Sequence, residues 1–288
     1  MRRLHIVDGT FELYRAHYSK RPDKTSPQGQ DVKATAGVMS SLVNLLADTT
    51  EQVTHLAVAF DHPIESFRND LYAGYKTGEG MESALVEQMA LVEQGVRALG
   101  IVVWPMAEFE ADDALATAAH RFADQVDQVR IMTPDKDLGQ CVRAQRVVQV
   151  DRMRQRVIDE QGVLQRHGVG PDCIPDWLAL VGDTADGIPG IAGFGAKTAA
   201  TLLNRYGSLE AIPENSDDWQ VRGAARLAAN LNAERDAAAL YKELATLRHD
   251  VPLAQTLDEL EWRGAPQDEF LAFAEGLGGM ALRPRRYS

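Results

Sequence analysis

Acidic residues occur in this chain at the points where apolar, strand-like runs end. The runs LHIVD and LAVAFD end at Asp8 and Asp61, and the run VRIMTPDKD carries Asp135 and Asp137. In an open sheet of parallel strands, binding sites form outside the carboxyl ends of the strands. We therefore expect these carboxylates to converge at one edge of a sheet.

Two further segments add acids to this set. EADD contributes Glu110, Asp112 and Asp113 at the start of a helical pattern, and VGDTAD contributes Asp183 and Asp186. Helix capping could explain any one of these acids, because aspartate is a common N-cap, but it explains the whole set poorly. Carboxylates crowded together raise one another's pKa, and hard divalent cations bound through oxygen relieve that repulsion. The sequence therefore predicts a site for Mg²⁺ or Mn²⁺, with acids enough for two ions.

Composition narrows the class of protein without deciding its partner. The 288 residues are 45% hydrophobic and 25% charged, as in globular proteins, and two domains fit in this length. No apolar run is long enough to span a membrane, MRRLHIVDG is typical of a first strand, and two cysteines, Cys141 and Cys173, indicate a reducing cytoplasm. The net charge of −12 disfavours a polyanionic partner, but much of it belongs to the predicted metal ligands, so local patches decide.

The pattern of elements divides the chain near residue 155. Before it, strands alternate with helices, which predicts an α/β fold with a parallel sheet. After it we expect only helices. The expected strands are 4–8, 54–60, 100–104, 129–133 and 146–150, and the expected helices are 33–48, 82–99, 111–123, 159–167, 174–182, 196–206 and 222–246.

The segment GIPGIAGFGAKTAATLL, residues 187–203, has two interpretations that concern phosphate. As a P-loop it fails, because its lysine comes one position late and it follows a helical stretch rather than a strand. As a helix–hairpin–helix, it places Gly193 and Gly195 in the hairpin, and backbone N–H groups at the next helix start can bind a DNA phosphate. Lys197 would add a charge. A plain glycine turn between packed helices is the alternative.

The segment SFRNDLYAGYKTGEG, residues 66–80, combines aromatic and basic residues. Tyrosine beside lysine can stack a base and hold its phosphate. Arg68, Tyr75 and Lys76 are the residues of interest. Taken alone, the segment is more typical of a solvated linker than of a DNA contact.

These motifs, in this order, resemble the 5′ nuclease (flap endonuclease) family, and most closely the 5′→3′ exonuclease domain of bacterial DNA polymerase I in a stand-alone form. We expect a free-standing member because a chain of this length has no room for a polymerase module. The matching stretches are VDG (7–9), FDH (60–62), SFR…GYK (66–76), EADD (110–113), TPDKDL (133–138) and GDTADGIPGIAGFGAKTA (182–199).

The resemblance implies a resolvase-like (PIN-like) α/β core with a helical arch and a helical lobe. The core would span 1–168 with the arch at about 66–95, the lobe with its helix–hairpin–helix 169–250, and a C-terminal extension 251–288. The implied function is a metal-dependent 5′→3′ exonuclease and 5′-flap endonuclease that hydrolyses DNA phosphodiesters by a two-metal-ion mechanism. The expected partner is DNA with 5′ ends or 5′ flaps, with no membrane partner. We expect a monomer in the bacterial cytosol, at the nucleoid, with a link to a DNA polymerase in replication and repair.

The resemblance also assigns residues. It implies two Mg²⁺ or Mn²⁺ ions, a K⁺ ion at the helix–hairpin–helix, and catalytic roles for Lys76, Arg68 and Asp135. Asp113 and Asp135 would lie between the two ion sites or in the first. The first ion site would use Asp8, Asp61, Glu110 and Asp112, the second Asp137, Asp183 and Asp186, and DNA would contact Arg68, Tyr75, Lys76, Gly193, Gly195, Lys197 and Thr198.

The chain departs from the family pattern at two positions. The arginine usual three residues after Lys76 is replaced by Glu79, which changes the electrostatics of the arch entrance. The asparagine usual after the last metal aspartate is replaced by Gly187, a change we expect to be tolerated. Two alternatives stay open. One is a non-catalytic, structure-specific DNA-binding homologue, which Glu79 favours; the other is a PIN-type ribonuclease, which would lack the helix–hairpin–helix and the arch.

Overall fold

The computed structural model describes residues 1–280 and 283–288 and divides into two compact units. The sheet unit comprises residues 1–64, 78–133 and 249–288. The helical unit comprises residues 65–77 and 134–248. The helical unit takes in residues before 169, and the C-terminal residues belong to the sheet unit.

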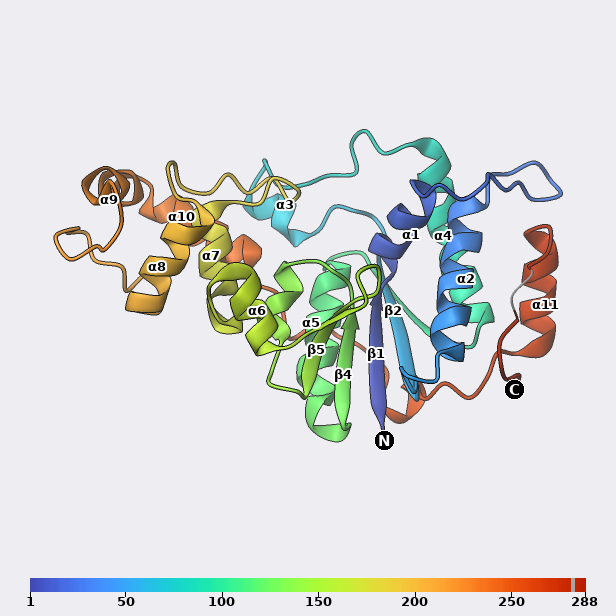
Figure 1. The fold of residues 1–288 in the computed structure, drawn as a ribbon. Helices are drawn as coiled ribbons and strands as arrows, with labels where there is room; N and C mark the ends of the chain where they lie inside the picture. Colours follow the sequence, from blue (N-terminus) through green and yellow to red (C-terminus); the bar gives the residue numbers. More distant parts are fainter. Residues whose placement is uncertain (281–282) are drawn as a thin grey trace. The chain divides into compact units, whose positions relative to one another are not determined.

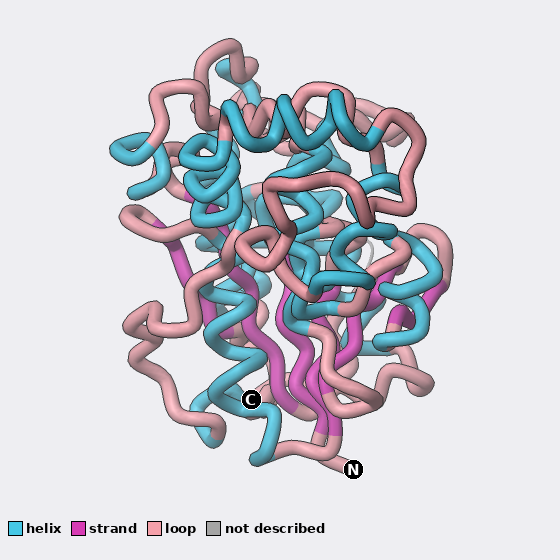
Figure 2. Tube along the Cα trace, turned by 90° about the vertical axis from the view of Figure 1, so that its left-hand side faces the viewer, coloured by secondary structure: helices cyan, strands magenta, loops and turns pink. Residues whose placement is uncertain are grey.

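The sheet unit is built on four parallel strands, coloured magenta with the others in Figure 2. They are β1 (Arg3–Asp8), β2 (His55–Asp61), β3 (Val102–Met106) and β4 (Gln128–Met132), in the order β3-β2-β1-β4. In register, Val7 of β1 lies opposite Val58 of β2 and Met132 of β4. Leu4, Ile6 and Val7 are fully buried, as expected for parallel strands covered on both faces. The predicted parallel sheet is confirmed.

Helices cover this sheet in two groups. The helix α5 (Ala111–Phe122), which continues into η1 (Ala123–Gln125), contacts all four strands. The helices α1 (Gly9–His17), α2 (Lys33–Ala47) and α4 (Ser83–Ala98) pack against one another (Figure 1). A Cβ at Gly9 would lie 2.5 Å from the Phe60 ring, so only glycine lets α1 begin this close to β2.

The C-terminal residues, expected only as an extension, complete the sheet unit. They form η4 (Asp258–Leu260) and α11 (Gln267–Gly276), which packs against α4 (Figure 1). The Trp262 indole N–H donates to the carbonyl of Leu99 at 2.8 Å, and the Phe270 side chain is fully buried. The segment is therefore part of the core of this unit.

The helical unit has its own hydrophobic core, centred on residues such as Trp177, Leu178 and Leu203. Its elements are α3 (Phe67–Leu71), η2 (Asp137–Cys141), β5 (Val147–Asp151), β6 (Arg156–Ile158), α6 (Glu160–His167), η3 (Pro171–Cys173), α7 (Ile174–Val181), α8 (Ala196–Tyr206), α9 (Ala224–Ala233) and α10 (Arg235–Ala245).

Two expectations for this part of the chain are wrong. Residues after 155 include a strand, β6, which pairs antiparallel with β5. It has only three residues and its first two are exposed, so it leaves no apolar run in the sequence. The single helix expected over 222–246 is two helices, because the backbone leaves helical geometry at Glu234 (φ −125°).

No helix in the described residues has the length and apolar character needed to cross a membrane.

Substituting Phe270 tests the role of the C-terminal segment. We expect Phe270→Ala to lower the free energy of unfolding by about 3–5 kcal/mol, because it leaves a cavity in a fully buried position. Leu271→Ala is the matched control; its side chain is 38% exposed, and we expect a cost below about 0.5 kcal/mol. Urea denaturation followed by circular dichroism measures both. Equal losses in the two variants would show that α11 is not part of the core.

Candidate functional site

Asp8 lies where β1 passes into α1, and its carboxylate joins two elements of the sheet unit. One carboxylate oxygen accepts the Phe11 N–H at 2.8 Å, which makes Asp8 the N-cap of α1. The other accepts the Thr133 hydroxyl, just beyond β4, at 3.1 Å. The side chain is buried, so its orientation at the carboxyl edge of the sheet is fixed.

The remaining acids of the sheet unit gather around the start of α5. Asp61, at the end of β2, accepts the Ala111 N–H at 2.7 Å. Glu110 and Asp113 form a reciprocal capping box, in which the Glu110 N–H donates to Asp113 at 3.0 Å. Both are buried, whereas Asp61 and Asp112 are half-buried. Asp61, Glu110 and Asp113 thus bond at the start of α5, as the capping interpretation requires, and their carboxylates also lie at the edge where sites form.

In the helical unit, three carboxylates form a compact group. Asp137, Asp183 and Asp186 each place an oxygen within 4.8 Å of the others. Asp137 begins η2, and its N–H donates to the exposed Asp135 at 3.0 Å. Asp183 exchanges two backbone hydrogen bonds of 2.8 Å with Ile188, which fold residues 183–188 into a tight loop. The residues of the predicted second ion site are thus brought together within one unit.

The Asp137 carboxyl is the least compensated group of this cluster. One of its oxygens is buried and has no hydrogen-bond partner among the described residues. Burial, followed by the charges of Asp135, Asp186 and Asp183, raises the pKa of Asp137 well above its usual range. Lys136 acts in the opposite direction.

Two lysines pair with the other members of the cluster. The Lys136 ammonium lies 2.7 Å from Asp183, and the Lys76 ammonium lies 2.9 Å from Asp186. Burial acts to lower the pKa of Lys136, but the hydrogen bond to Asp183 and the nearby acids outweigh it and raise that pKa. The lysines therefore neutralise two of the three acids and leave Asp137 without an ion-pair partner of its own in the described part of the chain.

This donor set fits a hard divalent cation. Such ions take oxygen ligands, and carboxylates supply both the oxygens and the charge. The unsatisfied oxygen of Asp137 points to a missing positive partner, because buried polar atoms normally have one. Asp137, Asp183 and Asp186 are the residues that would hold the ion.

Lys76 reaches Asp186 because two backbone segments approach closely. The Lys76 N–H donates to the Asp186 carbonyl at 3.0 Å. Gly187 has a φ of +77°, and a Cβ there would lie 2.1 Å from the carbonyl oxygen of Gly74. The departure from asparagine at this position therefore permits the approach that brings Lys76 to the acids.

Arg68 and Tyr75 occupy buried positions in the helical unit. The Arg68 side chain is 1% exposed, and its guanidinium donates to the carbonyls of Leu244 and Thr246 at 2.8 and 3.1 Å, near the end of α10. Tyr75 is 4% exposed and belongs to the hydrophobic core. In this structure both side chains anchor residues 65–77 and are turned away from solvent, whereas the DNA contacts expected of them would need exposed side chains.

The predicted helix–hairpin–helix has α7 and α8 as its helices. Gly195 is the N-cap of α8, and no side chain caps the first turn, so its N–H groups are available to an anion. Lys197 is exposed on this turn and Thr198 is half-buried. Gly193 lies in the hairpin with a φ of +87°.

The structure adds residues to this hairpin that the sequence did not indicate. The Asn230 side chain on α9 donates to the Ala192 carbonyl at 2.7 Å, and the Arg226 guanidinium lies beside Gly193. Both contacts are distant in sequence, so local pattern could not reveal them. Lys136, in contrast, lies between two predicted ligands in TPDKDL and could have been noticed there.

Removing the charge of Asp137 tests the cation site. We expect Asp137→Asn to raise the melting temperature in EDTA by about 2–4 °C, the shift of about 1 kcal/mol for a unit of this size, because it removes an uncompensated buried charge. The same variant should lose most of the stabilisation that MnCl₂ gives the parent protein. Differential scanning fluorimetry with and without Mn²⁺ measures both effects. The control is Asp172→Asn, an exposed acid of the same unit, which should behave as the parent does. A parent protein that Mn²⁺ does not stabilise would contradict the site.

Substituting Arg68 tests whether this side chain stabilises the helical unit; a residue with a role in catalysis alone would leave stability unchanged. We expect Arg68→Leu to destabilise the helical unit by about 1.5–3 kcal/mol, because it removes charged hydrogen bonds to two carbonyls. Urea denaturation, with hydrogen exchange of α10 peptides, measures the effect. Arg222→Leu, which removes an exposed arginine of the same unit, is the control. Unchanged stability in Arg68→Leu would refute the anchoring role.

Comparison with known proteins identifies the family. The model of the 5′-3′ exonuclease N-terminal resolvase-like domain matches residues 3–168, and that of the 5′-3′ exonuclease C-terminal SAM fold matches residues 169–268. A 5′-3′ exonuclease of Aquifex aeolicus is 36% identical over 221 residues, which cover 76% of this chain and 75% of that protein. DNA polymerase I of Pseudomonas aeruginosa is 38% identical over 277 residues, or 93% of this chain. This chain spans only 29% of that polymerase and 26% of the DNA polymerase I of Rhizobium leguminosarum.

Solved structures agree on the fold. The T5 D15 protein co-crystallised with metal ions matches with a TM-score of 0.68 and 20% identity, over 96% of this chain and 98% of that one. The catalytic core of Rad2 in complex with a DNA substrate matches with a TM-score of 0.62 and 14% identity, over 97% and 89%. The two family models together cover residues 3–268, and the chain belongs to the 5′-3′ exonuclease family.

Proposed function

We propose that this chain is a metal-dependent nuclease that hydrolyses phosphodiesters of DNA at 5′ ends and 5′ flaps. The observation that carries the proposal is the group formed by Asp137, Asp183 and Asp186, with its unsatisfied buried oxygen, in a chain that both family models match. The Aquifex aeolicus relative is named a 5′-3′ exonuclease, which supports the same activity. The T5 D15 structure with metal ions and the Rad2 structure with a DNA substrate support the same partners.

The residues proposed to hold the ions come from both units. Asp8, Asp61, Glu110 and Asp112 would serve one ion, and Asp137, Asp183 and Asp186 the other, with Asp113 and Asp135 supporting them. When bound, two divalent ions supply an activated water and stabilise the leaving oxygen of an in-line displacement. We propose Mg²⁺ or Mn²⁺ in this role, because carboxylate oxygens suit both.

Lys76 and Lys136 have a proposed role that derives from their partners. Each is paired with an aspartate that would become a ligand. Once that aspartate shares its charge with an ion, the ammonium loses part of its attraction to it and becomes available to an anionic phosphate. Lys76 would thereby contact the reacting phosphate, in keeping with the catalytic role implied for it.

The start of α8 is the proposed contact for DNA away from the reaction. Its uncapped N–H groups, Lys197 and Thr198 can bind a backbone phosphate without reading sequence, and Arg226 adds a second charge beside the hairpin. A K⁺ ion at the hairpin, action as a monomer, location at the nucleoid and a link to a DNA polymerase belong to the same proposal. The link rests on the DNA polymerase I relatives, whose matching region is 26% to 29% of their length.

The test is cleavage of a labelled 5′-flap duplex by the purified protein. We expect cleavage with Mg²⁺ or Mn²⁺, none in EDTA, and a loss of about a hundredfold or more in Asp183→Asn, equivalent to about 2.7 kcal/mol of barrier. Asp172→Asn serves again as the control for the loss of one negative charge.

Other outcomes would select the alternatives. Tight flap binding without cleavage in any divalent ion would indicate a non-catalytic DNA-binding homologue. Cleavage of single-stranded RNA with no action on flap DNA would indicate a PIN-type ribonuclease.

A further inference from the structure

A groove of about 620 Å³ lies between the β5–β6 hairpin and α6, within the helical unit. Arginines dominate its charged lining: Arg154 and Arg156 come from the hairpin and Arg166 comes from α6. All three are exposed, so their guanidinium groups face solvent along the groove. None of the predicted metal or DNA-binding residues lines it.

Basic residues are concentrated here against the trend of the chain. The chain has a net charge of −12, yet residues 141–166 contain six arginines and only three acids. No lysine occurs in this stretch. The arginines are Arg143, Arg146, Arg152, Arg154, Arg156 and Arg166, and the acids are Asp151, Asp159 and Glu160.

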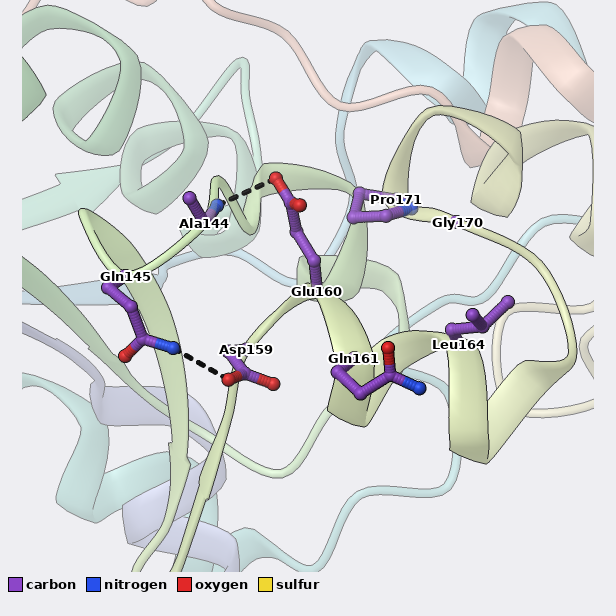
Figure 3. Close-up of a pocket in the computed structure, with 8 residues that line it drawn as sticks. All are labelled: Ala144, Gln145, Asp159, Glu160, Gln161, Leu164, Gly170 and Pro171. Atoms are coloured by element: carbon purple, nitrogen blue, oxygen red, sulfur yellow. Dashed lines mark hydrogen bonds between the residues drawn. The ribbon is translucent and has the colours of Figure 1, made fainter.

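Two of the three acids accept hydrogen bonds outside the groove. Asp159 caps α6 by accepting the Gly162 N–H at 2.9 Å and also accepts the Gln145 side-chain amide at 2.7 Å. Glu160 accepts the Ala144 N–H at 2.7 Å. Figure 3 shows the bonds to Gln145 and Ala144, with both carboxylates in a separate pocket that Pro171 also lines.

The third acid compensates one arginine of the groove. Asp151 pairs with Arg154 at 2.9 Å. Arg166 donates to the backbone carbonyl of Pro134 at 3.1 Å, a neutral partner. Arg156 makes no ion pair with any residue that the structure describes. The groove therefore retains an excess of positive charge.

We propose that this groove binds the phosphodiester backbone of the DNA substrate, as a contact surface separate from the helix–hairpin–helix. Guanidinium groups donate two hydrogen bonds in a fixed geometry that matches a phosphate, which favours arginine over lysine at such sites. The exposed Val157 side chain beside them offers an apolar surface of the kind a sugar ring can contact. The proposal rests on the proposed function for the identity of the polyanion.

The groove is linked to the loop that carries two of the predicted metal ligands, so DNA bound there would be positioned relative to that loop. Arg166 bonds to Pro134, and Asp135 and Asp137 come directly after it in the chain. A strand held by Arg154, Arg156 and Arg166 is therefore fixed relative to the loop that carries two predicted ligands. The contact would position DNA without specifying its sequence, because it involves only backbone phosphates.

The experiment compares two triple variants of the full chain that remove the same charge. One is Arg154→Gln/Arg156→Gln/Arg166→Gln in the groove. The control is Arg2→Gln/Arg97→Gln/Arg263→Gln, which changes exposed arginines of the sheet unit. Fluorescence anisotropy measures the affinity for a blunt duplex and for a single strand across a salt series. Ca²⁺ replaces Mg²⁺ so that substrate is not consumed.

We expect the groove variant to bind the duplex at least about tenfold more weakly at low salt. Its plot of log K against log salt should be shallower by about 2–3, because each lost phosphate contact removes about 0.9 from the slope. The control should retain the parent slope. A loss confined to the single strand, with a slope change of about 0.7 per contact, would assign the groove to the 5′ strand and equally support it.

A groove variant with the parent slope for both DNAs would overturn the inference. This result is distinct from failure of the proposed function. If the parent cleaves flaps and the slope is unchanged, only the groove proposal fails. If the parent binds DNA with a groove-dependent slope but cleaves nothing, the groove proposal stands and the nuclease proposal fails.

Discussion

The helical unit must hold closely spaced carboxylates together against their electrostatic repulsion, and the rest of the site follows from this constraint. Asp137, Asp183 and Asp186 are held within a few ångströms of one another, and the burial of Asp137 and Asp183 limits the screening of their charges by water. The fold resists this repulsion through short-range backbone contacts. Hydrogen bonds between Asp183 and Ile188 close one loop, and the start of η2 fixes Asp137. The site is thus organised in advance, and a bound cation would relieve the repulsion stored in it.

The two lysines show how the unit tolerates this arrangement. Lys136 is adjacent to Asp137 in sequence, so the turn that places Asp137 also brings Lys136 to the site, where it pairs with Asp183. Lys76 belongs to a segment remote in sequence, and its approach depends on the anchoring of Arg68 at the end of α10 and on the close contact at Gly187. A buried arginine eight residues earlier in the same segment therefore helps to position a lysine beside the acids. A substitution at Arg68 would affect both the stability of the unit and the charge balance of the site.

The sequence predicts well the features that depend on local pattern. Apolar runs ending in aspartate identified β1 and β2, and because parallel strands end at one edge, the pattern alone places Asp8 and Asp61 at that edge. Long-range contacts could not be predicted from this local pattern. Arg68 and Tyr75 lie in a polar segment typical of a linker, and only the packing of α10 and the core reveals that they are buried. The burial of Trp262 and Phe270 could not be predicted from local pattern either. Trp262 bonds to Leu99, more than a hundred residues away, and Phe270 lies on α11, which packs against α4. The short strand β6 escaped because two of its three residues face solvent.

The net charge of this protein is a poor guide to its partner because positive and negative side chains are unevenly distributed over the chain. Nine acids belong to the proposed ion sites, where cations would offset them, and Asp159 and Glu160 are satisfied by local hydrogen bonds. The groove beside the β5–β6 hairpin is lined by three arginines and one acid, and Arg226 adds positive charge beside Gly193. At physiological salt the Debye length is about 8 Å, so a phosphate experiences the groups nearest to it and little of the distant surplus of acid. A chain of net charge −12 can therefore attract a polyanion wherever its acids lie elsewhere and its guanidinium groups are exposed.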